Sequence, residues 1–275
     1  MTTQLSNYTT TKLLTDKAEI QAYLETDRDY AAYAIGDLDA GFFEKCTWYV
    51  AEENDAVCAL ALVYAGLEPP VLFLMGAGDG TAALLDGPVR VERAYLNVRQ
   101  EHLNALGKFY QWDELSPMWR MARSVRPDRF PKPIGSCKRL SADDVVRLRA
   151  LYALGGGDAF DPAQVTQGVF YGIERDGQLI AVAGTHLVSD AYGVGAIGNV
   201  MTHPDYRGHG YATQTTSAVC AELTRRGIAT IVLNVRQDNA PAVRVYEKLG
   251  FTRHCPFYEG VIQRSIFKSQ ISKRE

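Results

Sequence analysis

In two stretches of the chain, segments rich in apolar and aromatic residues lie on either side of a two-residue turn, a pattern that predicts β-hairpins. The stronger example runs from Phe170 to Gly184 and turns at Asp176-Gly177. A similar stretch runs from Trp48 to Leu62 and turns at Asn54-Asp55, 122 positions earlier. The matching patterns are the first indication of an internal repeat.

A repeated pentapeptide supports the duplication. The sequence Leu-Asn-Val-Arg-Gln occurs at 96–100 and again at 233–237, each time after the hairpin. This second offset is 137 residues, so the second copy is 15 residues longer between hairpin and pentapeptide. We therefore predict two domains, residues 1–134 and 135–275. The proline-rich, charged segment Arg126–Pro133 suits a linker between them.

The longer interval of the second copy holds a predicted strand, a loop and a helix. An apolar stretch from Gly193 to Thr202 is followed by the run Arg207-Gly-His-Gly-Tyr-Ala212 and by helix-forming residues from Thr213 to Arg225. Glycines allow close approach of a ligand to the backbone, and the first turn of a helix offers unpaired N–H groups to phosphate oxygens. Arg207 adds a cation with forked donors. The arrangement predicts a pyrophosphate site, and the apolar run 229–235 predicts a buried strand after it.

This segment resembles the acyl-CoA-binding motif of the GNAT superfamily of N-acetyltransferases. The motif has Arg or Gln, two residues, Gly, one residue, then Gly or Ala, and Arg207, Gly210 and Ala212 match it. A second signature of the family follows at the expected distance, in Asn239, Ala242, Tyr246, Gly250 and Phe251. The resemblance covers roughly residues 138 to 262. It implies an α+β fold of two tandem GNAT-like domains, each a mixed, mostly antiparallel twisted sheet flanked by helices.

The resemblance also implies a reaction: direct attack of a primary amine on acetyl-CoA, without a metal. The acceptor would be a small molecule, an amino acid or a peptide. Tyr246 would protonate the departing thiolate, Asn239 would hold the pantetheine arm, and the backbone N–H near Val200 would polarise the thioester carbonyl. The implied donor-binding residues are Val200, Met201, Thr202, Arg207, Gly208, His209, Gly210, Tyr211, Ala212, Thr213, Asn234, Asn239, Ala242 and Tyr246.

The general base is left open by the sequence. Many GNAT relatives carry a Glu on the strand before the Arg-Gly loop, but the stretch from Gly193 to Thr202 contains neither Asp nor Glu. The candidates are His186, on the preceding strand, and Asn199, acting through an ordered water. Each role has a structural alternative. His186 could be a packed core histidine, and Tyr246 could be an aromatic residue packed on the sheet. An acceptor amine with a low pKa would need no base at all.

The first copy differs from the second where the phosphate site is expected. Its stretch Val71–Gly80 has no arginine and places Asp79 among the glycines, where a carboxylate would repel a diphosphate. At the offset of 137, His102 replaces Asn239 and Phe109 replaces Tyr246. We therefore predict a degenerate first half and an active second half.

Two alternatives remain at this stage. The glycines between 76 and 80 also suggest the nucleotide loop of an S-adenosylmethionine-dependent methyltransferase, which requires a doubly wound sheet. A CoA-binding sensor or scaffold without turnover is the other, because the usual Glu is missing. The acceptor site is expected near the glycine-rich loop Leu154–Pro162, which could close over the substrate. Asp158, Phe160 and Asp161 would then lie near a cationic amine. Asp161 is also expected to cap the next helix.

Composition restricts the picture only slightly. The chain has 275 residues, 47% of them apolar, and a net charge of −3, which gives no reason to expect a nucleic-acid partner. No apolar run is long enough to cross a bilayer, and the first residues lack the order of a signal peptide. The five cysteines are odd in number and lack metal-ligand spacing. We expect a cytoplasmic protein with reduced thiols, as a monomer or homodimer, without a metal or a membrane partner.

Overall fold

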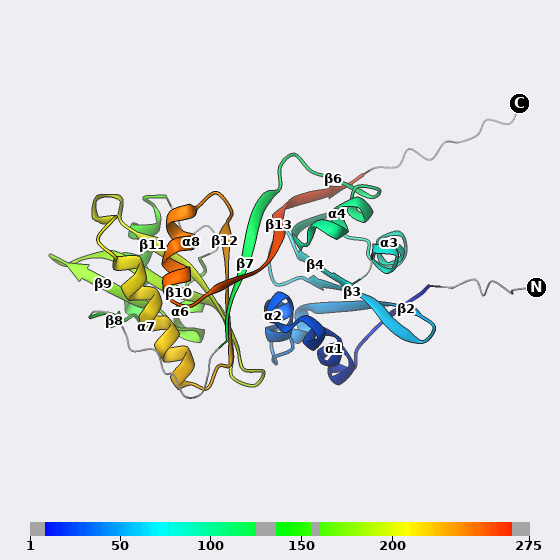
Figure 1. Cartoon of the computed structure of the whole chain (residues 1–275), viewed down its shortest axis with the longest axis horizontal. Helices are drawn as coiled ribbons and strands as arrows, with labels where there is room; N and C mark the ends of the chain where they lie inside the picture. Colours follow the sequence, from blue (N-terminus) through cyan, green and yellow to red (C-terminus); the bar gives the residue numbers. More distant parts are fainter. Residues whose placement is uncertain (1–8, 77, 125–135, 156–159, 266–275) are drawn as a thin grey trace, which may run out of the picture. The chain divides into compact units, whose positions relative to one another are not determined.

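The computed structural model describes residues 9–76, 78–124, 136–155 and 160–265, which form two compact units (Figure 1). The first unit takes residues up to 23, residues 45–117 and residues from 257 on, and the second takes residues 24–44 and 118–256. Each unit is a mixed sheet flanked by helices. The predicted α+β fold is confirmed.

The first unit contains a sheet with the strand order β1-β2-β3-β4-β5-β13, and β6 pairs with β13. Strands β4 and β5 are connected by α3 and pair in parallel, whereas the other neighbouring strands of this order are antiparallel. The elements are β1 (Thr10–Leu13), α1 (Lys17–Leu24), β2 (Cys46–Glu53), β3 (Ala56–Tyr64), β4 (Val71–Gly76), α3 (Gly78–Asp86), β5 (Arg93–Val98), α4 (Gln100–Leu106), β6 (Tyr110–Gln111) and the second part of β13 (Thr252–Arg264).

The second unit repeats this topology with the order β8-β9-β10-β11-β12-β7. Strands β11 and β12 are connected by α7 and pair in parallel, and the other neighbouring strands of this order are antiparallel. The elements are η1 (Glu25–Asp27), α2 (Arg28–Gly36), η2 (Phe43–Lys45), β7 (Ser116–Ser124), β8 (Lys138–Arg139), η3 (Ala142–Asp144), α5 (Val145–Tyr152), α6 (Ala163–Gln167), β9 (Tyr171–Arg175), β10 (Gln178–Ser189), β11 (Val194–Thr202), η4 (Pro204–Tyr206), α7 (Tyr211–Arg225), β12 (Thr230–Arg236) and α8 (Ala240–Lys248).

Both predicted hairpins are confirmed. The turn between β2 and β3 has φ of 52° at Asn54 and 62° at Asp55, and the turn between β9 and β10 has 52° at Asp176 and 77° at Gly177. Positive φ at both central residues is what a two-residue type I′ turn requires, and its twist matches that of the flanking strands. The two hairpins occupy equivalent places in the two sheets.

The repeat is also visible in the structure, but the compact units do not follow the predicted division at 134/135. The repeated pentapeptide lies at the end of β5 in one unit and of β12 in the other. Beside β5 lies β13, from the second half of the sequence, and beside β12 lies β7, from the first half. Each exposed strand edge is thus covered by a strand that follows the other copy. The predicted boundary follows sequence order, whereas the compact units follow the hydrogen-bonded strands.

The helix of the predicted phosphate site is present as α7, which begins at Tyr211, two residues before the predicted start. Helix α6 begins at Ala163, whose N–H donates to the Asp161 carboxylate at 2.7 Å. Phe160 packs against Tyr152, with ring centroids 4.9 Å apart. Asp158 and the predicted linker 126–133 lie outside the described residues. Within the described ranges, no helix is both long and apolar enough to cross a membrane.

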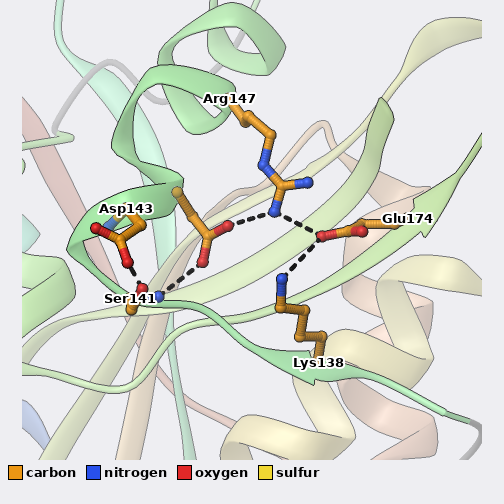
Figure 2. Close-up of polar contacts among 6 residues, drawn as sticks. Lys138, Ser141, Asp143, Arg147 and Glu174 are labelled. Atoms are coloured by element: carbon orange, nitrogen blue, oxygen red, sulfur yellow. Dashed lines mark hydrogen bonds and ion pairs between the residues drawn. The ribbon is translucent and has the colours of Figure 1, made fainter. Parts of the chain in front are cut away.

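Charged side chains connect β8, η3, α5 and β9 at one end of the second unit's sheet (Figure 2). Arg147 contacts Asp144 and lies 2.5 Å from Glu174, which also accepts from Lys138 at 3.4 Å. Asp144 accepts from the N–H of Ser141 at 2.9 Å and completes a capping box. This network fixes the short edge strand β8 without contributing to the groove described below.

The glycines between β4 and α3 are explained by close packing. Gly76 has φ of 107°, and a Cβ there would lie 2.3 Å from the carbonyl oxygen of Cys58. A Cβ at Gly80 would lie 2.8 Å from that of Ala59. The described strands of this unit form a largely antiparallel sheet, and not the doubly wound sheet that the methyltransferase alternative requires.

Candidate functional site

A groove opens in the second unit where β11 and β12 separate. Their parallel pairing runs from Val194–Thr230 to Ile197–Leu233 and does not continue to the ends of the strands. The groove has a volume of about 830 Å³. Its walls are Met118, Gly155, His186, Ile197, Gly198, Asn199, Val200, Met201, Thr202, Tyr206, Arg207, Gly208, Gly210, Tyr211, Ala212, Thr213, Asn234, Val235, Arg236, Asn239, Pro241, Ala242, Arg244, Val245, Tyr246 and Lys248.

A β-bulge marks the point of separation. On β10, Val182 pairs with Met201 and Gly184 pairs with Gly198, so that two residues of β11 face one of β10. The extra residue is Asn199, with φ of 52°, a conformation that asparagine tolerates better than most side chains. Bulges redirect a strand and re-aim its side chains. Beyond it, the main chain of β11 is open on the side of β12.

The loop between β11 and α7 has the backbone conformation of an anion site. Gly208 has φ of 82° and Gly210 has φ of 79°, and Gly210 is the N-cap of α7. A Cβ at either glycine would meet nothing within 4 Å, so space does not explain these residues. Their positive φ does, because glycine adopts this conformation without strain. The N–H groups of the first helical turn have no partner within the helix. Arg207 is exposed beside them, with Nε 3.4 Å from the carbonyl oxygen of Thr202.

Helix α8 contributes a further part of the groove wall. The side-chain oxygen of Asn239 accepts from the N–H of Ala242 at 3.2 Å and caps the helix, which leaves its amide nitrogen as the donor. Tyr246 is 7% exposed and packs against Phe251, with ring centroids 6.1 Å apart. Burial raises the pKa of Tyr246 to about 12. The phenol therefore carries its proton throughout the neutral range.

His186 lies at the groove against the backbone of β11. A Cβ at Gly198 would lie 1.7 Å from Nε2 of His186, so glycine makes room for the ring. The rings of His186 and Tyr33, from α2, have centroids 6.4 Å apart. Burial lowers the pKa of His186 to about 4. The imidazole is therefore neutral at pH 7 and is a weak base.

The groove collects the predicted donor-site and catalytic residues, with one exception. His209 is not among the lining residues; its Nδ1 lies 2.9 Å from the carbonyl oxygen of Arg207 and closes the loop. Arg244 and Lys248 also line the groove, one helical turn apart, and were not predicted as donor-site residues from the sequence. Their i, i+4 spacing beside Tyr246 was the available signal. Groups of three His, Cys, Asp or Glu side chains able to hold a metal are absent from the described residues.

Comparisons with known proteins identify the segment that forms the groove. Residues 139–251 match the model of the acetyltransferase (GNAT) family. The chain is 35% identical over 102 residues to a mycothiol acetyltransferase of Tsukamurella paurometabola, a match that spans 36% of this chain and 35% of that protein. It is 33% identical over 95 residues to the ribosomal protein bS18-alanine N-acetyltransferase of Escherichia coli, which spans 34% of this chain and 58% of that protein.

A solved structure supports the tandem architecture. The structure of a tandem GNAT protein from the clavulanic acid biosynthesis pathway matches with a TM-score of 0.53 and 13% identity, over 94% of this chain and 98% of that one. At this identity the similarity concerns the fold alone. The sequence relatives above are matched over about a third to somewhat more than half of their own length. The similarity to the GNAT family of acetyltransferases thus covers residues 139–251, which form most of the groove.

Proposed function

We propose that the protein is an acetyl-CoA-dependent N-acetyltransferase that acetylates a primary amine of a small molecule, an amino acid or a peptide. The observation that carries this proposal is the groove of the second unit. It brings together a helix N-terminus with a glycine loop, an open strand edge and a protonated phenol. These are the groups that a CoA thioester and its departing thiolate need.

The donor would lie along the groove from the loop to the bulge. The first-turn N–H groups of α7 and the guanidinium of Arg207 suit the diphosphate. The pantetheine arm would pair with the open edge of β11 between Val200 and Thr202. Arg244 and Lys248, both exposed, add positive charge along the same groove.

The proposed reaction can be written with the groups of the protein and water alone. The amine nitrogen attacks the thioester carbonyl carbon, which forms the C–N bond of a tetrahedral intermediate. The C–S bond then breaks, its electron pair goes to sulfur, and Tyr246 donates the phenolic proton to the thiolate. The nitrogen loses one proton to water, and the phenolate of Tyr246 recovers one from water. The products are an amide and free CoA.

His186 is unsuited to removing a proton from a strongly basic ammonium group, because burial lowers its pKa to about 4. Its neutral imidazole would instead contribute a hydrogen bond at the acceptor end of the groove. The proposed reaction therefore uses an amine that is already neutral when it attacks.

The names of the relatives support acetyl transfer more strongly than they support any one acceptor. One relative is named for mycothiol and the other for an alanine of a ribosomal protein. A small molecule and a peptide α-amine both remain within the proposal. The alternative is a CoA-binding sensor without turnover, which the absence of a Glu between Gly193 and Thr202 favours.

The test is release of CoA thiol from acetyl-CoA with a panel of amines, followed by mass spectrometry of the amine. The panel contains amino-acid amides, short peptides with a free N-terminus, and aliphatic amines. Turnover with an acetylated product supports the enzyme. Tight binding of acetyl-CoA with no turnover on the whole panel supports the sensor, and absence of acetyl-CoA binding contradicts both.

A further inference from the structure

Asn199 is held in one orientation by two neighbours. The Tyr152 hydroxyl, on α5, donates to the main-chain oxygen of Asn199 at 2.8 Å. The side-chain nitrogen of Asn199 donates to Oε1 of Gln164, on α6, at 2.9 Å. Burial raises the pKa of Tyr152, so this hydroxyl remains a donor over the accessible pH range. The bulge residue is therefore fixed at both its backbone and its side chain.

The same contacts determine which side-chain atom of Asn199 remains available. Gln164 Oε1 also accepts from the backbone N–H of Asp161 at 3.1 Å, and a backbone N–H can only donate. The Gln164 atom at this position is thus the oxygen, and the Asn199 atom that contacts it must be the nitrogen. The remaining atom, Oδ1 of Asn199, is an acceptor.

That oxygen is buried beside the groove without a hydrogen-bond partner among the described residues. Asn199 is only 8% exposed and is one of the lining residues. A buried carbonyl oxygen without a donor has lost its hydration without a replacement, which destabilises the folded state. Such an oxygen at the wall of a groove is the kind of group that a ligand N–H satisfies.

Asn199 also lies at the boundary between the two faces of β11. Its neighbour Val200 packs against the core beneath α7 and α8, where the donor is proposed to bind. Asn199 itself contacts α6, on the other face, and the adjacent Gly198 contacts His186. A nitrogen beside Oδ1 of Asn199 would thus be next to the strand segment proposed to hold the thioester.

We propose that Oδ1 of Asn199 accepts an N–H of the attacking amine and aims its lone pair at the thioester, with Gln164 and Tyr152 as positioning residues. This inference rests on the proposed function. An amide oxygen orients a neutral amine but cannot take up its proton, so the substrate class is an amine that reaches the site uncharged. Weakly basic α-amines of peptides and amino-acid derivatives satisfy this requirement best near neutral pH. The surplus proton leaves to water after the C–N bond has formed.

Other titratable groups near Asn199 must be separated from the amine in a pH profile. His186 titrates near pH 4 and Tyr246 near pH 12, both for reasons of burial. Asp37 is the C-cap residue of α2, a helix that packs against β10, β11 and β12, and burial raises the pKa of Asp37 to about 7. If Asp37 caused the fall of kcat/KM at low pH, this acidic limb of the pH profile would have the same position for every acceptor. A limb caused by the amine would move with the acceptor.

The experiment measures kcat/KM for the acceptor against pH with two amines that the enzyme turns over. Suitable probes are alaninamide, with an amine pKa of about 8, and Nα-acetyl-lysine amide, with a pKa of about 10; two other accepted amines of different pKa serve equally. We expect the acidic limb to shift with the pKa of the amine, and to be unaffected by Asp37→Asn. A limb common to both amines would overturn the inference, because an enzyme group would then remove the proton.

Variants test the residue itself. Asn199→Gly suits the positive φ and should lower kcat/KM roughly 10- to 100-fold while acetyl-CoA affinity is retained. Asn199→Asp supplies a carboxylate that takes up the proton, so the limb should become independent of the amine. Asn54→Gly, at the same φ of 52° in a turn outside the groove, is the matched control. Unchanged kcat/KM and limb position in both Asn199 variants would overturn the inference.

The positioning role of Gln164 has its own readout. Gln164→Leu should lower kcat several-fold, and Gln164→Glu, which retains an oxygen for the Asn199 amide, should restore most of it. Equal losses in both variants would reduce Gln164 to a structural residue. Absence of turnover in the unmodified protein with any amine is a different result, since it contradicts the proposed function itself.

Discussion

In each unit a helix connects two parallel strands, but the ends of the first strand differ. In the first unit β4 ends at Gly76 and α3 begins at Gly78. In the second unit the segment from His203 to Gly210 separates β11 from α7. The longer connection is what provides room for an arginine and two glycines with positive φ. Equal topology therefore does not carry equal chemistry.

The end of β4 is also filled by side chains. The hydroxyl of Tyr23 donates to the carbonyl oxygen of Cys58 at 3.0 Å, and Nε2 of His102 lies 3.1 Å from the carbonyl oxygen of Gly76. In the second unit the corresponding strand end borders the groove, with Asn199 and Tyr246 at its walls. One strand end is therefore packed with side chains and the other borders a groove, although the two sheets share a topology.

Reversing the charge of the loop should have the largest effect. Arg207→Glu replaces a proposed diphosphate ligand by a repelling carboxylate, and we expect acetyl-CoA affinity to fall roughly 10³-fold, about 4 kcal/mol. Isothermal titration calorimetry measures the change. The control is Arg225→Glu, at the C-terminal end of α7, which should bind acetyl-CoA as the parent does. Equal affinity in both variants would mean that the donor does not use this loop.

Making α8 resemble the first unit should affect turnover instead of binding. Tyr246→Phe introduces the residue type found at position 109, and loss of the acid should lower kcat roughly 10²-fold. Acetyl-CoA affinity should remain close to that of the parent. The control is Tyr171→Phe, outside the groove. If kcat were unaffected, Tyr246 would be a packing residue and another group would protonate the thiolate.

Two glycine substitutions should separate stability from binding. Gly76→Ala forces a Cβ to within 2.4 Å of the Tyr23 hydroxyl at positive φ, and we expect a loss of about 2 kcal/mol in the free energy of unfolding. Acetyl-CoA affinity of the folded protein should be unchanged. Gly210→Ala has open space, so it should cost less stability but weaken acetyl-CoA binding. Urea unfolding and calorimetry measure both, and the reverse pattern would contradict the assignment of the two loops.

The pH dependence of stability should show the smallest effect. The pKa of His186 falls from its usual 6.5 to about 4 on folding, so the unfolded chain takes up a proton first as pH is lowered. His186 therefore favours the folded state above pH 6.5, and this contribution is lost between 6.5 and 4. Between pH 7 and pH 5, we expect the free energy of unfolding of His186→Gln to fall by about 1 kcal/mol less than that of the parent, after allowance for solvent screening.

Urea unfolding at pH 7 and pH 5 measures this difference. Asp37 acts in the opposite sense, because its raised pKa of about 7 makes stability fall as pH rises from 4 to 7. The comparison between parent and variant cancels that contribution. An identical pH dependence in both proteins would show that His186 is solvated.

Local features of the structure could be predicted from the sequence where short segments specify them. Asp176-Gly177 and Asn54-Asp55 are suited to positive φ and determined the hairpins. The glycine loop before α7 combined a backbone requirement with a helix start, and both are local. The groove residues followed from the order of two short signatures. Their roles in binding and catalysis stay predictions.

Features that depend on distant contacts could not be predicted in this way. The sequence presents Asn199 as a candidate base, but only the register between β10 and β11 makes it a bulge residue with positive φ. The contact that orients it comes from Gln164, 35 positions earlier. Phe160 was predicted near the acceptor amine, but it packs against the ring of Tyr152.

The sequence by itself determined the repeat, the strand–loop–helix order of the site and the absence of that loop from the first copy, because turn conformation and helix starts depend on neighbouring residues. The tertiary structure alone decided which strands complete each sheet, since β7 and β13 each pair with a strand from the other half of the sequence. It also decided that α2 packs against β10 and β11. Strand edges accept any partner of suitable register, so local sequence does not specify the choice, and the packed chain does.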